Sequence, residues 1–101
     1  MEKRTNKYHL KLELLATAKV DETIYAPIEL EFDNHDNIFT IVERMKQRNL
    51  FHTENQSVEF AIGLKMFSEV MLKNRENPLF SDFSPAFREF MKKLKSTPIE
   101  D

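Results

Sequence analysis

Apolar and polar residues alternate in two segments of the first third of the chain, which is the pattern of a β-strand with one buried face. The first segment is 8–14 and the second is 28–33. Their apolar positions are Tyr8, Leu10, Leu12 and Leu14 in the first and Ile28, Leu30 and Phe32 in the second. Residues 20–23 form the expected turn, so the strands should pair as an antiparallel hairpin. Pro27 cannot donate to a strand ladder, and we expect it at an edge position or a bulge.

After residue 35 the apolar spacing changes to three and four, which predicts helices. The first helix is expected over 36–48, with Asn34 or Asp36 as its N-cap. Its apolar positions are Ile38, Ile41, Val42 and Met45. This helix is amphipathic and should pack through one face.

A longer helix is expected over 54–75, because Thr53 and Gln56 have the spacing of a capping box. Apolar residues cover more than half of its circumference, so the helix should have neighbours on more than one side. Gly63 inside it costs about 1 kcal/mol relative to alanine. A close crossing by another backbone would explain this glycine.

The last third of the chain contains a break and a third helix. Asn77 and Pro78 end the long helix, and residues 79–83 are apolar without a period, which is typical of a loop. Ser84 and Pro85 then predict an N-cap followed by proline in the first turn. The apolar positions of the helix that follows are Phe87, Phe90, Met91 and Leu94.

The order of elements is therefore ββααα, an α+β fold in which an N-terminal antiparallel hairpin precedes three α-helices. Because an isolated hairpin is marginal in water, we expect a single layer of helices to cover one face of the sheet. The length of 101 residues fits a single domain, 1–101. Within it we expect an ordered core over 7–95 and a loose tail over 96–101.

Charge and cysteine content argue against several functional classes. The chain has 15 basic and 17 acidic residues, whereas a nucleic-acid-binding domain usually carries a basic excess. It has no cysteine, which excludes disulfides and fits a reducing compartment. No apolar run reaches the length of a signal peptide core or a membrane helix. We therefore expect a cytoplasmic protein without nucleic-acid or membrane partners.

Four blocks of the sequence resemble, in the same order, a family of short bacterial proteins. They are EFDNHDNIF at 31–39, GLKMFSEVML at 63–72, PLF at 78–80 and FREFM at 87–91. The resemblance spans residues 8–94. This family is catalogued as a domain of unknown function, so the resemblance implies a small bacterial cytosolic protein and transfers no activity, cofactor or catalytic residue.

The triplet Asn34-His35-Asp36 is the most suggestive polar cluster. Histidine is a common metal ligand, and an adjacent carboxylate could orient it. However, adjacent residues rarely face one centre, and His9 and His52 stand at no metal-binding spacing from His35. Helix capping is the preferred interpretation, and we expect no metal.

Glu69 lies within the apolar stretch 66–72, where a carboxylate could act as an acid or a base. Lys65 and Lys73 stand four residues to either side and favour an ion-paired position on the solvated face. No serine, cysteine or second carboxylate stands at a spacing that completes a catalytic set with Glu69. We therefore predict no catalytic residue and no cofactor.

Leu79, Phe80 and Phe83 are large apolar residues in the expected loop, where they either pack into the domain or form a docking patch. The open edges of a two-stranded sheet could also pair with a second chain. We expect a non-enzymatic protein–protein interaction module acting as a homodimer or with an unidentified protein partner. The alternative is a small-ligand or metabolite binder, or a minor enzyme. It would use a crevice between the hairpin and the long helix, with His35 or Glu69 supplying polarity.

Overall fold

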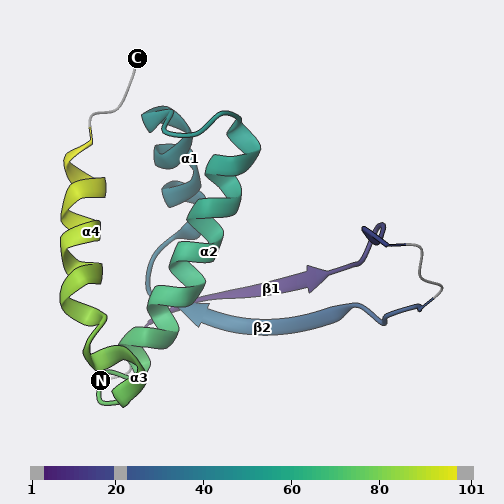
Figure 1. Cartoon of the computed structure of the whole chain (residues 1–101), viewed down its shortest axis with the longest axis horizontal. Coiled ribbons are helices and arrows are strands. Elements are labelled where there is room, and N and C mark those ends of the chain that lie inside the picture. Colours follow the sequence, from purple (N-terminus) through teal and green to yellow (C-terminus); the bar gives the residue numbers. More distant parts are fainter. Residues whose placement is uncertain (1–3, 20–22, 98–101) are drawn as a thin grey trace. The chain divides into compact units, whose positions relative to one another are not determined.

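A computed structural model describes residues 4–19 and 23–97 of the chain. The described residues form two β-strands followed by four α-helices (Figure 1). They divide into two compact units, which we call the hairpin unit, up to His35, and the helical unit, from Asp36 onwards. The prediction of a hairpin followed by helices is confirmed, whereas the predicted number of three helices is wrong.

The hairpin unit contains β1, Asn6–Leu12, and β2, Ile28–Asn34, which pair antiparallel as predicted. The register places apolar residues opposite one another on one face: Tyr8 opposite Phe32, Leu10 opposite Leu30, and Leu12 opposite Ile28. The Tyr8 and Phe32 rings stack with centroids 5.4 Å apart. Residues 20–22 of the expected turn lie outside the described residues.

The opposite face of the hairpin is charged. Cross-strand pairs of opposite charge, or of histidine with glutamate, follow one another along it: Lys7 with Asp33, His9 with Glu31, and Lys11 with Glu29. A diagonal contact adds to them, since His9 Nε2 lies 3.0 Å from Glu29 Oε1. Such pairs each stabilise a sheet by about 0.2–1 kcal/mol, and this face is suited to solvent.

Helix α1, Ile38–Arg48, begins after Asn37 rather than at the predicted caps. The Asn37 side-chain oxygen accepts hydrogen bonds from the backbone N–H groups of Phe39, at 3.0 Å, and Thr40, at 3.3 Å. The expected capping by Asn34 or Asp36 is therefore wrong, because Asn37 is the extended residue immediately before the first turn. The helix ends at Asn49, whose φ of 53° is a left-handed conformation that asparagine tolerates.

Helix α2, Glu54–Lys73, begins at the predicted N-cap. Thr53 Oγ1 accepts a hydrogen bond of 3.1 Å from the Gln56 N–H, while the Gln56 side chain accepts one of 3.2 Å from the His52 N–H. Gly63 has open space around it, since a β-carbon built there would meet no heavy atom within 4 Å. The expected close crossing of another backbone at Gly63 is therefore wrong.

The predicted loop after α2 contains a helical turn. Helix α3, Pro78–Ser81, is capped by Asn77, whose side-chain oxygen accepts a hydrogen bond of 3.0 Å from the Leu79 N–H. A single turn is too short to show a helical period in the sequence, which is why residues 79–83 resembled a loop. Helix α4, Ser84–Ser96, has Phe83 at its N-cap position. Ser84 is therefore not the cap, and its hydroxyl donates to the Phe80 carbonyl oxygen at 2.8 Å.

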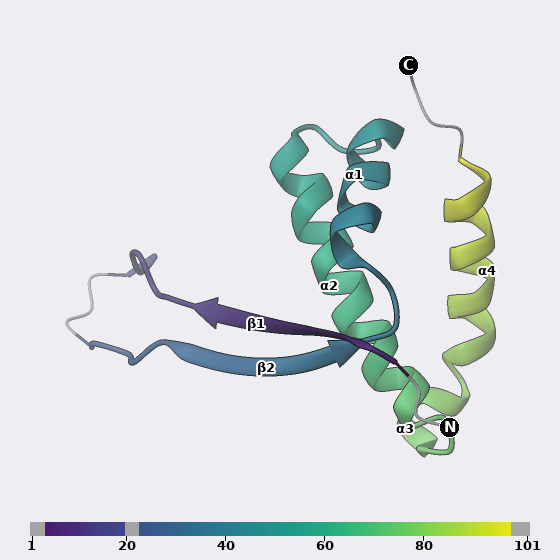
Figure 2. The same cartoon turned by 180° about the vertical axis from the view of Figure 1, so that it is seen from behind.

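The helical unit has a core of its own, built from α1, α2 and α4 (Figures 1 and 2). Its buried centre consists of one residue from each helix: Met45, Ala61 and Leu94. Partly buried residues surround it: Ile41, Val42, Phe51, Phe60, Leu64 and Met91. The expectation that α2 has neighbours on more than one side is confirmed, because it contributes to this core and also contacts α3.

The contact with α3 is aromatic. The Phe67 ring of α2 lies 6.2 Å from the Phe80 ring and 6.1 Å from the rings of Phe83 and Phe87, each in an edge-on geometry. Such geometry adds about 0.5–1.5 kcal/mol per pair beyond the burial of area. This cluster fixes α3 and the start of α4 against the C-terminal half of α2.

Within the described residues, no helix is both long and apolar enough to span a bilayer.

Candidate functional site

The sequence-predicted patch of Leu79, Phe80 and Phe83 does not form one surface. Phe80 is buried and contacts Phe67. Leu79 is 76% exposed and Phe83 is 44% exposed, with the Phe83 ring 5.8 Å from that of Phe87. The patch is therefore divided between a core residue, a partly covered ring and one exposed leucine. The contacts of Phe80 and Phe83 with Phe67 hold α3 and the start of α4 against α2.

The polar residues predicted from the sequence as candidate site residues are His35, Asp36 and Glu69. Asp36 Oδ2 lies 2.8 Å from Lys65 Nζ, and the two side chains are 32% and 15% exposed. This part-buried ion pair joins the segment before α1 to the middle of α2. Glu69 is 8% exposed, so its expected position on the solvated face of the long helix is wrong. His35 belongs to the hairpin unit.

These polar residues have the arrangement of structural groups. Among the described residues, no group of three or more histidine, aspartate or glutamate side chains is placed to hold a metal ion. The described buried polar side-chain atoms all have hydrogen-bond partners. A satisfied, part-buried ion pair fixes the geometry of the elements that carry it, and this is the role that Asp36 and Lys65 have here.

The hairpin unit presents a different kind of surface. Seven of its described large apolar residues are exposed to between 37% and 94%. We call them the hairpin apolar surface: Leu12, Leu14, Leu15, Ile24, Tyr25, Ile28 and Leu30. Three of them lie on the apolar face of the paired strands, and the other four come from the segments that follow β1 and precede β2.

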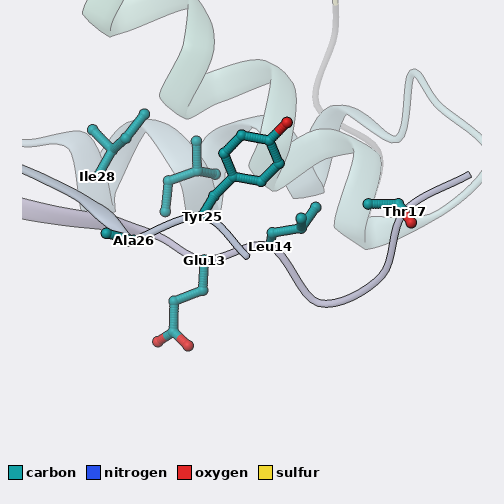
Figure 3. Close-up of a pocket in the computed structure, with 7 residues that line it drawn as sticks. Glu13, Leu14, Thr17, Tyr25, Ala26 and Ile28 are labelled. Atoms are coloured by element: carbon teal, nitrogen blue, oxygen red, sulfur yellow. The ribbon is translucent and has the colours of Figure 1, made fainter. Parts of the chain in front are cut away.

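An open hollow of about 460 Å³ lies within this surface. It is lined by residues of both chain segments: Leu12, Glu13, Leu14, Thr17, Tyr25, Ala26 and Ile28. Figure 3 shows the Tyr25 ring and the Leu14 and Ile28 side chains on one side of the ribbon, while the Glu13 carboxylate points to the other. The hollow is therefore an apolar depression with little polar chemistry.

The alternation that predicts the strands explains how the hollow forms. Leu12 and Leu14 are two residues apart, as are Ala26 and Ile28, so each pair continues one face of an extended segment. Alternation predicted Leu12, Leu14, Ile28 and Leu30 as apolar strand positions, without indicating a site there. Leu15, Ile24 and Tyr25 were not among the predicted positions. A signal for them was present, since three large apolar residues stand close to the expected turn, where polar residues are usual.

Few polar groups lie around the hollow. The polar side-chain groups that line the hollow are the hydroxyls of Thr17 and Tyr25 and the carboxylate of Glu13, which points away from the hollow. General acid–base chemistry needs a titratable group within reach of the reacting atom, whereas apolar association needs contiguous area that can be removed from water. The hairpin apolar surface supplies apolar area that can be removed from water.

Comparison with known proteins agrees with the fold and leaves the activity open. A crystal structure of a protein of unknown function from Pectobacterium atrosepticum is similar, with a TM-score of 0.77 and 35% sequence identity. The match covers 91% of this chain and 98% of that one. The search of curated proteins finds no match. The model of a family described as a Domain of Unknown Function, DUF3861, matches residues 6–96. This chain therefore belongs to the DUF3861 family, as the resemblance of its sequence blocks implied.

Proposed function

We propose that this protein is a non-enzymatic protein–protein interaction module of the cytoplasm that binds through the hairpin apolar surface. The observation that carries the proposal is the exposure of seven large apolar side chains on a unit of about a third of the chain. Leucine or isoleucine exposed singly is normal on a protein surface. Four of the seven, Leu12, Leu14, Tyr25 and Ile28, line one hollow, and large exposed apolar side chains that lie together are typical of an interaction site.

The composition of the surface fits binding of a protein. Interface centres are depleted in charge and enriched in aromatic residues. Tyr25 lies at the centre of the hollow, flanked by aliphatic side chains. Its ring supplies large contact area while its hydroxyl remains available for a hydrogen bond. The charged face, by contrast, already pairs its groups across the strands.

The test is an affinity purification from cells that produce the protein naturally, followed by native mass spectrometry. It compares the wild-type chain with the double variant Leu15→Asp/Ile24→Asp. Both positions are more than 90% exposed, so the substitutions remove apolar area without removing buried contacts. We expect the wild type to retain a bound protein chain, of its own or another kind, and the double variant to lose it.

The matched control is Leu79→Asp, which introduces the same change at a 76% exposed leucine of the helical unit. It should retain the bound chain. Circular dichroism of all three proteins checks that the fold is intact. Equal retention by the wild type and the double variant, or a wild type that carries no protein chain, would contradict the proposed function.

A further inference from the structure

We infer that the occupant of the hairpin apolar surface is a second copy of this chain, packed face to face across a twofold axis. The inference rests on the proposed function and names its partner. Four properties of the hairpin unit favour a second copy: its need for cover, its exposed area, its shape and its charge distribution.

The first property is the need for permanent cover. A two-stranded hairpin is at best marginally stable alone in water, and it requires packing on its apolar face. Leu12 and Ile28 are directly paired in the ladder, yet both are more than half exposed. A partner that is present only intermittently would leave this face bare between encounters. A second copy is available wherever the protein is made, and in equal amount.

The second property is the exposed area. Side chains of this size and exposure each offer roughly 100 Å² of apolar surface. The seven residues of the hairpin apolar surface therefore come close to the ~800 Å² per partner that a standard interface buries. A symmetric pair uses the same area twice, once from each chain. The surface is thus large enough for a stable dimer without any contribution from the helical unit.

The third property is shape. Leu15 and Ile24 are 93% and 94% exposed, and each is adjacent in sequence to a residue that lines the hollow. The same unit therefore carries both projecting aliphatic side chains and an apolar depression. A hollow of about 460 Å³ is large compared with the ~30 Å³ of one water molecule. In a twofold interface, each copy can place a projecting side chain in the hollow of the other.

The fourth property is charge. The charged face of the hairpin satisfies its groups internally, through the His9–Glu29 contact of 3.0 Å and the Lys11–Glu13 pair of 3.2 Å. Among the described residues, the side chains that make up the hairpin apolar surface carry no charge that would select an oppositely charged partner. A net charge of −2 per chain also gives weak repulsion between two copies. Two copies of an uncharged apolar face can pack against each other without burying a charge.

The experiment is sedimentation velocity and equilibrium on the full-length chain between about 1 and 200 µM. We expect a wild-type dimer. Ile24→Asp should raise the dissociation constant at least 100-fold, because it places two carboxylates in the apolar interface. Leu79→Asp, the matched control, should leave the dissociation constant within threefold of the wild-type value.

A second measurement locates the interface directly. Since the native chain contains no cysteine, a single introduced cysteine can form a cross-link only with another copy. Ile24→Cys should give a covalent dimer with a short bis-maleimide at concentrations where the protein is dimeric. Leu79→Cys should remain a monomer on denaturing gels. A wild-type dimer that Ile24→Asp leaves intact, or equal cross-linking at both positions, would overturn the inference.

The outcomes separate this inference from the proposed function. A wild type that is monomeric throughout the concentration range overturns the second-copy inference. If that monomer still retains a different protein in the affinity purification, and the double variant loses it, the proposed function stands. If it retains no protein chain, both fail. A dimer that Ile24→Asp dissociates and Leu79→Asp does not supports both.

Discussion

The two units of this chain differ in how they use their apolar residues. The helical unit buries Met45, Ala61 and Leu94, one from each of three helices, and surrounds them with partly buried side chains. The hairpin unit, among its described residues, buries one residue, Asn34, which is polar. Most of its large aliphatic side chains are exposed instead. The helical unit therefore closes a core, although some of its large apolar side chains remain exposed, whereas the hairpin unit forms an open surface.

The difference lies in what each kind of element can do by itself. Three amphipathic helices can point their apolar faces at a common centre and remove them from water. A two-stranded sheet has one apolar face and no second layer of its own, so its side chains remain exposed until something packs on them. Stability of the helical unit should accordingly depend on single buried residues, whereas the hairpin apolar surface should matter for association.

The largest predicted effect is on the core of the helical unit. Met45→Ala should lower the free energy of unfolding by about 2–4 kcal/mol, because it removes a side chain that is 3% exposed and leaves a cavity. Phe39→Ala, at a 73% exposed position of the same helix, is the matched control and should cost less than about 0.5 kcal/mol. Urea unfolding followed by circular dichroism measures both. Equal losses would contradict the distinction between the core and the surface of α1.

The next largest effect concerns the ion pair between Asp36 and Lys65. Lys65→Met should lower the free energy of unfolding by about 1–2 kcal/mol, because the Asp36 carboxylate keeps its part-buried position and loses the ammonium group of Lys65. Solvent reaches the carboxylate and limits the loss. Lys46→Met is the control, since Lys46 Nζ lies 3.3 Å from Glu43 Oε1 in a surface ion pair within α1. A cost at Lys65 no greater than that at Lys46 would show that burial adds nothing to the pair.

Much of the secondary structure could be predicted from the sequence because its signals are local. Alternation predicted both strands and their antiparallel pairing, whereas the register in which they pair was not predicted and comes from the structure. Thr53 was identified as a cap because the residue three positions later completes a known motif. The helical spacing of apolar residues in α1 and α4 also needed no knowledge of their neighbours.

The remaining errors come from information that is not local. Asn34, Asp36 and Asn37 are all suitable caps, and the backbone geometry decides in favour of Asn37. Glu69 has lysines at the spacing of a surface ion pair, but tertiary packing leaves its side chain only 8% exposed. The hairpin apolar surface could be anticipated only in part, because alternation shows which side chains share a face and not whether that face is covered.

A smaller effect, of opposite sign, is predicted at the middle of α2. Gly63→Ala should raise the free energy of unfolding by about 0.5–1 kcal/mol, because alanine loses less backbone entropy in a helix. The added methyl group meets no heavy atom within 4 Å. Urea unfolding of the variant and the wild type measures the change. A loss of stability would mean that another element approaches Gly63 closely, as the sequence alone suggested.

The smallest predicted effect is on the charged face of the hairpin. Glu29→Gln removes the charge from a contact whose two side chains are 54% and 55% exposed, so water and salt already screen it. The free energy of unfolding should fall by less than about 0.5 kcal/mol, and the sedimentation behaviour should match that of the wild type. Ile24→Asp tests the apolar surface of the same unit by the same sedimentation measurement. If Glu29→Gln weakened association as much as Ile24→Asp, the charged face would take part in the contact, and the assignment of binding to the apolar face would be wrong.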